Sequence, residues 1–161
     1  MRSLQSRWSV AGLCLLLMGC AGGPVPIDLT SLREDPGDEA LVDDAFEILG
    51  LPWERSTIGR GTIDVHLVDE PDDAEIGGTT LLVTPRCFKA VASVRSPEHI
   101  AHEVFHALVS NGDHVCDYPD CPDELLDNLM ISGDAPVIGR ELTQPQEDEL
   151  ERGYRRLTRC R

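Results

Sequence analysis

Two histidines and a glutamate near the middle of the chain have the types and spacing of a metal site. They belong to the segment His102-Glu103-Val104-Phe105-His106. Residues four positions apart lie one above the other on an α-helix, so both imidazoles can reach one ion. Zinc binds neutral imidazole well, and catalytic zinc sites usually combine three protein ligands with one water. Glu103 is placed to accept a proton from that water and so to act as a general base.

The residues around this segment predict the helix that the spacing requires. Ser96 is a favourable N-cap, Pro97 suits the first helical position and Glu98 complements the helix dipole. The apolar side chains share one face, which excludes both histidines and the glutamate. We expect the helix to run to about Val109 or Ser110, with one face on a sheet and the other facing a cleft.

Three later segments carry a family resemblance: Gly112-Asp113-His114, Asn128-Leu129-Met130, and Leu142-Thr143 with Gln146. With the central helix they resemble the metzincin clan of zinc peptidases, in particular its short matrixin-like bacterial members. The clan pattern is H-E-x-x-H-x-x-G-x-x-H, then a Met-turn that often reads N-L-M. A C-terminal helix introduced by L-T and a nearby glutamine follows. The resemblance covers roughly residues 60–160.

This resemblance implies a site, a fold and a function. His102, His106 and His114 would hold one zinc ion, Glu103 would be the general base, and Met130 would pack beneath the metal without binding it. The implied fold is α+β, a small zincin-like domain whose twisted sheet packs on the active-site helix, followed by the Met-turn and the C-terminal helix. The implied function is hydrolysis of peptide bonds in a peptide or protein substrate.

The sequence departs from the family pattern at the third ligand. Val109 and Gly112 stand where the family has its glycine and its third histidine, and His114 comes two residues late. We expect a helix half a turn longer, followed by a left-handed turn at Gly112, to absorb the extra residues. Asp113 and Glu124 remain alternative third ligands.

Other candidate ligands have simpler interpretations. His99 lies on the histidine face of the helix and is expected to be a first-turn residue or a partner of a ligand. His66 lies in a strand pattern, where a half-exposed position explains it. The acidic residues between positions 113 and 124 suggest calcium, but their spacing fits no EF-hand-type loop. We expect a solvated acidic loop there.

The remaining elements follow from periodicity and punctuation. Apolar residues at helical spacing predict a helix over Asp38–Leu51, and alternation predicts a strand over Thr62–Val68. Two short β-like segments cover 79–83 and 87–94. A last helix is expected from Gln144 or Pro145 to about Leu157, with Thr143 as its cap. This order indicates an α+β fold.

The N-terminal residues 1–19 have the pattern of a signal peptide. A positively charged start precedes an apolar stretch that is too short to span a bilayer. It ends in Leu17-Met18-Gly19-Cys20, which resembles the lipobox of bacterial lipoproteins, so Cys20 would carry the lipid. An ordinary signal peptide cut near Ala21 is the alternative. Either interpretation implies export, and the first implies lipid anchoring in the bacterial cell envelope.

Composition divides the rest of the chain and limits its partners. Glycine and proline over residues 20–38 predict a flexible tether, and residues 39–161 a single domain. The chain has 29 acidic and 14 basic residues, a net charge of −15. Such a charge disfavours nucleic acid as a partner and leaves acyl chains as the membrane contact.

The cysteines predict two disulfides. Of six cysteines, one lies in the signal peptide and Cys20 is the proposed anchor. Four then remain in an oxidising compartment, which allows three pairings. We favour a staple between Cys116 and Cys121, with Cys87 bonded to Cys160. A competing interpretation makes Cys116 and Cys121 zinc ligands, but an oxidising compartment disfavours free thiolates.

Two other functions remain open at this point. The chain could be a zinc-binding module that keeps the peptidase fold but has little activity, as the displaced His114 suggests. The presence of Glu103 disfavours this, because a structural zinc site needs no base. The chain could also be a metal-free surface lipoprotein held together by its disulfides.

Overall fold

The computed structural model describes residues 23–28, 36–56, 61–68, 78–84, 88–109, 113–132 and 138–160. The expected signal peptide over residues 1–19, the proposed anchor Cys20 and the predicted disulfide partner Cys87 lie outside these ranges. Within them, no helix is both long enough and apolar enough to cross a membrane.

The described residues combine helices with a mainly parallel sheet, in agreement with the predicted mixture of α and β structure. The elements in chain order are β1 (Val25–Asp28), α1 (Pro36–Leu49), β2 (Trp53–Ser56), β3 (Thr62–Val68), β4 (Gly78–Thr84), β5 (Phe88–Val94), α2 (Pro97–Leu108), β6 (Cys116–Asp117), the 3-10 helix η2 (Asp123–Leu125), β7 (Ile131–Ser132) and α3 (Gln144–Thr158).

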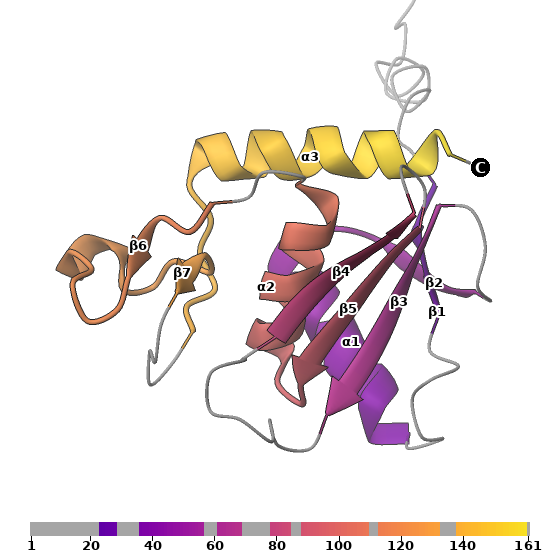
Figure 1. The fold of residues 1–161 in the computed structure, drawn as a ribbon, viewed down its shortest axis with the longest axis horizontal. Helices are drawn as coiled ribbons and strands as arrows, with labels where there is room; N and C mark the ends of the chain where they lie inside the picture. The colour runs from indigo at the N-terminus through magenta and orange to yellow at the C-terminus, as the bar shows by residue number, and fades with distance from the viewer. Residues whose placement is uncertain are drawn as a thin grey trace, which may run out of the picture.

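The main sheet has five strands in the order β2-β1-β3-β5-β4 (Figure 1). Strand β1 pairs in parallel with β2 and β3, and β3 pairs in parallel with β5. Strand β4 alone among these is antiparallel, and it forms the edge of the sheet beside β5. Strand β5 follows β4 in the sequence and leads directly into α2, the helix that carries His102 and His106.

Strand β1 corrects the prediction of a flexible tether over residues 20–38. Val25 and Ile27 are fully buried, and the Val25 N–H donates to the Pro52 carbonyl at 2.8 Å. A four-residue strand that contains a proline carries no readable alternation, and its Gly- and Pro-rich surroundings resemble a linker. Strand β1 is buried because it pairs with β2 and β3, and local sequence does not predict such pairing.

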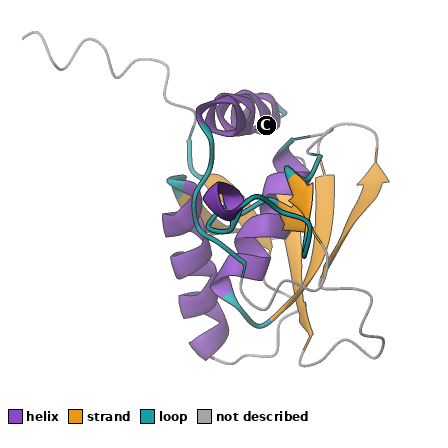
Figure 2. Ribbon diagram, turned by 90° about the vertical axis from the view of Figure 1, so that its left-hand side faces the viewer, coloured by secondary structure: helices purple, strands orange, loops and turns teal. Residues whose placement is uncertain are grey.

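Helices α1 and α2 cover one face of the sheet (Figure 2). Their inward side chains include Val42, Phe46 and Leu49 from α1 and Ile100, Val104 and Phe105 from α2, and these join buried strand residues in one apolar core. The apolar positions recur at helical spacing, so each helix buries one stripe. Because α2 is packed in this way, its histidine-bearing side is held in a fixed orientation.

Helix α3 lies across the end of the molecule, close to the C-terminal end of α2 (Figure 1). Leu150, Tyr154 and Leu157 of this helix are buried, and the Tyr154 hydroxyl donates to the Gly23 carbonyl at 2.6 Å. Gly153 lies so close to α2 that an added Cβ would stand 2.2 Å from the Leu108 carbonyl oxygen. Glycine at this position therefore permits the two helices to meet.

Candidate metal centre

Three imidazoles meet at one point beside α2. His102 and His106 lie one turn apart on that helix, and His114 comes from the segment that leads into β6. Their Nε2 atoms form a triangle in which each of the three separations is 3.1 Å. Within the described ranges, these three residues are the one group of at least three His, Cys, Asp or Glu residues able to hold a metal ion.

The chemistry of the three nitrogens fits a cation better than it fits hydrogen bonding. Each imidazole Nε2 carries either one hydrogen or one lone pair, so at least two of three mutually adjacent Nε2 atoms are of the same kind. The three contacts therefore cannot all be hydrogen bonds. Nitrogen ligands of one tetrahedral zinc ion, each at about 2.0–2.1 Å from it, lie roughly 3.3 Å apart. The observed triangle is close to that size.

His102 is held in the tautomer that a metal ligand needs. Its Nδ1 lies 2.8 Å from the Leu129 carbonyl oxygen, which can only accept, so Nδ1 carries the hydrogen. The side chain is 7% exposed, and burial lowers its pKa to about 4, despite the opposing effect of that hydrogen bond. The ring is therefore neutral at pH 7, with a lone pair on Nε2.

The other two histidines are more accessible. His106 is half-buried and His114 is exposed. Partial desolvation of the ring nevertheless lowers the pKa of His114, against the opposing charges of Asp117 and Asp113. A neutral imidazole is the form that binds metal, and the exposed position of His114 leaves the ion site open to solvent on that side.

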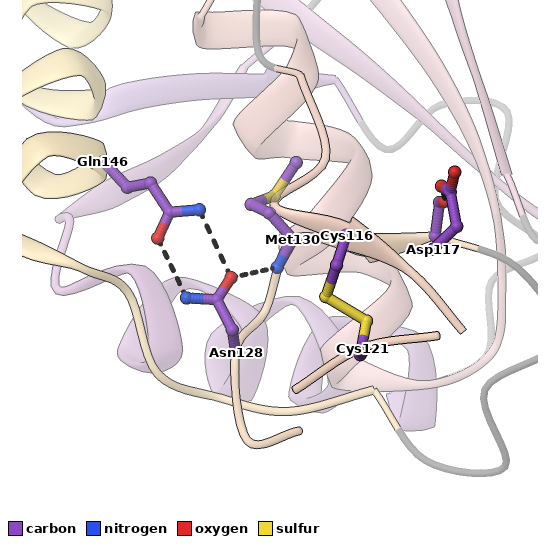
Figure 3. The surroundings of a disulfide bond; sticks show 7 residues. Cys116, Asp117, Cys121, Asn128, Met130 and Gln146 are labelled. Carbon is purple, nitrogen blue, oxygen red and sulfur yellow. Dashed lines mark hydrogen bonds between the residues drawn. A yellow bond between two sulfur atoms is a disulfide. The ribbon is translucent and has the colours of Figure 1, made fainter. Parts of the chain in front are cut away.

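The segment that carries His114 is fixed by backbone pairing and by a disulfide. The Val115 N–H donates to the Met130 carbonyl at 2.8 Å, and β6 then pairs in parallel with β7. Cys116 and Cys121 form a disulfide that closes the loop beside it, as predicted (Figure 3). Cys160 is also disulfide-bonded, while its predicted partner lies outside the described residues.

The end of α2 differs from the expectation. The helix stops at Leu108, and Val109 is already extended, with φ of −102° and ψ of 98°. This φ is open to any residue, so valine can stand where the family has glycine. The predicted half turn of extra helix is wrong: α2 ends before Val109, so the helix does not absorb the two additional residues. The predicted turn at Gly112 lies outside the described residues.

The remaining predicted site residues lie as follows. Glu103 is buried beside His102 on α2, and Met130 is fully buried next to Leu129, whose carbonyl contacts His102. The alternative ligands Asp113 and Glu124 are exposed, and neither belongs to the three-histidine group. His99 is half-buried on α2 outside that group, and burial lowers its pKa. His66 instead contacts Asp64, with Nε2 and Oδ2 2.7 Å apart.

Two further residues near the three histidines, Asn128 and Gln146, belong to the segments that resemble the metzincin pattern, but the sequence predicted no role for either. Asn128 and Gln146 are 4% and 9% exposed, and their amides form two reciprocal hydrogen bonds of 3.0 and 3.2 Å. Figure 3 shows Asn128 between Gln146 of α3 and the backbone N–H of Met130. Asn128 could be noticed in the sequence as the first residue of N-L-M, and Gln146 as the glutamine after L-T. No sequence feature predicted that the two side chains contact each other.

No family model matches the chain, and neither the curated proteins nor the solved structures contain a match to it.

Proposed function

We propose that this protein is a zinc-dependent peptidase whose metal is held by His102, His106 and His114. The observation that carries the proposal is the convergence of three Nε2 atoms at 3.1 Å beside a buried glutamate of the same helix. Three neutral nitrogen ligands suit zinc, and a site with three protein ligands keeps one position open, as catalytic zinc sites do.

A bound zinc ion would polarise the peptide carbonyl and lower the pKa of a water molecule to about 7. Glu103 would accept the proton of the attacking water at its carboxylate. As the water oxygen bonds to the carbonyl carbon and the C–N bond breaks, Glu103 would pass that proton to the leaving amine. His102, His106 and His114 would act as ligands only.

We further propose that the chain is a divergent member of the metzincin clan. In support, the H-E-x-x-H sequence lies on a helix packed against a sheet, and Met130 is buried beside the carbonyl that contacts His102. The C-terminal helix begins after Thr143 with a capping box to Gln146. The two additional residues before His114 depart from the clan pattern only locally, because the His114 imidazole still reaches those of His102 and His106.

The proposed place of action is the bacterial cell envelope. The pattern of residues 1–19 and the lipobox-like sequence before Cys20 support export and lipid anchoring. The strongly acidic chain would then be held at the membrane by its acyl chains and would meet peptide or protein substrates outside the cytoplasm.

The test of this function compares the wild-type protein with Glu103→Ala on a fluorescently labelled, unfolded protein substrate. We expect both proteins to bind one zinc ion, and the variant to lose about 10²–10⁴-fold in hydrolysis, the usual contribution of a general base. Equal hydrolysis by the two proteins would exclude Glu103 as the base. A zinc-loaded wild-type protein that cleaves no peptide bond would favour a zinc-binding module instead.

A further inference from the structure

The hydrogen bonds around Leu129 link the N-terminal end of α3 to His102, one of the proposed metal ligands, through one peptide group. The C=O of the peptide between Leu129 and Met130 accepts from His102 Nδ1 at 2.8 Å. The N–H of the same peptide donates to Asn128 Oδ1, also at 2.8 Å. In a planar trans peptide these two groups point in opposite directions. Asn128, by holding the N–H, therefore sets the direction in which the C=O points toward His102.

Asn128 is itself oriented by Gln146. Its Nδ2 donates to Gln146 Oε1 at 3.0 Å, and its Oδ1 accepts from Gln146 Nε2 at 3.2 Å (Figure 3). A flipped Asn128 amide would place its NH2 group against two donors, the Met130 N–H and Gln146 Nε2. These contacts therefore allow the Asn128 amide one orientation. Gln146 Oε1 also accepts from the Thr143 N–H at 2.7 Å and from the Thr143 hydroxyl at 3.0 Å. The capping box of α3 thereby fixes Gln146.

We propose that Asn128 and Gln146 are positioning residues for the metal site, which hold the Leu129–Met130 peptide so that His102 presents its Nε2 lone pair to the ion. The inference rests on the proposed zinc site. Successive hydrogen bonds in a buried chain polarise one another, so a donor held at the N–H also makes the C=O a stronger acceptor. Partners of this kind fix the tautomer and ring direction of a ligating histidine.

The deciding experiment measures zinc affinity, by competition with a chromophoric chelator, and the visible absorption of the cobalt-substituted protein. Asn128→Ala should weaken zinc binding about 10-fold or more, as changes to the partners of ligands do, and should alter the cobalt spectrum. Gln146→Glu keeps the oxygen that caps α3 but removes the amide that donates to Asn128. It should weaken binding in the same direction by a smaller factor.

The matched control is Tyr154→Phe, which removes a hydrogen bond of α3 to Gly23 at a distance from this chain of contacts. It should lower the midpoint of thermal unfolding without changing zinc affinity or the cobalt spectrum. If Asn128→Ala and Gln146→Glu behave like this control, with zinc affinity within twofold of the wild type, the positioning role is refuted.

A second readout needs no metal. In the metal-free wild-type protein, NMR should show the His102 Nδ1–H protected from exchange with water, and Asn128→Ala should remove that protection. If the wild-type protein binds no zinc, the proposed function fails, and this exchange measurement still decides the positioning role. Should Asn128→Ala fail to fold, Gln146→Glu decides it in the same two assays. Unchanged protection in a folded variant would overturn the inference.

Discussion

At the scale of single residues, the three histidines are held to different degrees. His102 is buried and hydrogen-bonded at Nδ1, whereas His114 is exposed and reaches the cluster from a segment outside the helix. The sequence predicted His102 and His106 as ligands from the H-E-x-x-H spacing on a well-capped helix, since residues four apart lie one turn above each other. His114 was predicted from the family resemblance. The link between Asn128 and Gln146 was not predictable, since tertiary packing alone brings together residues 18 positions apart.

His114→Ala tests whether this exposed histidine is a ligand. Removal of a ligand should weaken zinc binding by more than the 10–100-fold that changes to ligand partners typically cause. Isothermal titration with zinc checks this, with Asp113→Ala as the control from the adjacent position. If Asp113→Ala weakens binding and His114→Ala does not, the carboxylate is the third ligand.

At the scale of elements, the site depends on how three segments meet. Helix α2 carries two histidines, the strand pair β6–β7 places the third, and α3 supports the turn at residues 128–130. Periodicity predicted α1, β3, α2 and α3 at nearly their observed bounds, because each is long enough to show a repeat. The four-residue strands β1 and β2 are too short for that, so their existence depends on pairing partners elsewhere in the chain.

Gly153→Ala tests the close approach of α3 to α2. Glycine to alanine inside a helix ordinarily stabilises it by up to about 1 kcal/mol. Here the new Cβ would stand 2.2 Å from the Leu108 carbonyl oxygen, so α3 must shift. We expect the free energy of unfolding in urea to fall by about 1–3 kcal/mol. Arg152→Ala, on the exposed side of α3, should change it by less than about 0.5 kcal/mol. A more stable Gly153→Ala variant would contradict this packing.

The disulfide beside β6 should support the third ligand. Replacement of Cys116 and Cys121 by serine frees the loop that follows His114 and should lower the free energy of unfolding by about 2 kcal/mol. Zinc affinity should fall as well, because zinc binding must then order a freer His114 segment, which costs more conformational entropy. Chemical unfolding and zinc titration of the double variant measure the two effects. Unchanged zinc affinity would show that the β6–β7 pairing alone places His114.

At the scale of the whole molecule, the order of strands makes the N-terminal segment part of the fold. Strand β1 lies between β2 and β3, so the sheet is continuous only when Val25–Asp28 is present. The sequence suggested a domain that begins near residue 39, because glycine and proline surround this strand. The overall mixture of helix and sheet was predictable from the order of periodic segments, whereas the strand order was not.

Truncation tests this continuity. A chain that begins at Asp38 lacks β1, which leaves β2 without a partner and one edge of β3 open. We expect it to lose cooperative thermal unfolding as followed by circular dichroism. A chain that begins at Gly23 retains β1 and the carbonyl that accepts from Tyr154, and should unfold cooperatively. If the shorter chain unfolds like the longer one, β1 is dispensable.

The most direct test of the central claim is the metal content of the purified protein, measured by elemental mass spectrometry. His102→Ala removes a member of the cluster, and His66→Ala removes a histidine that contacts Asp64 instead. We predict close to one zinc ion per chain in the wild-type protein and in His66→Ala, and almost none in His102→Ala. Absence of zinc from the wild-type protein after reconstitution at neutral pH, or its retention in His102→Ala, would contradict the three-histidine site.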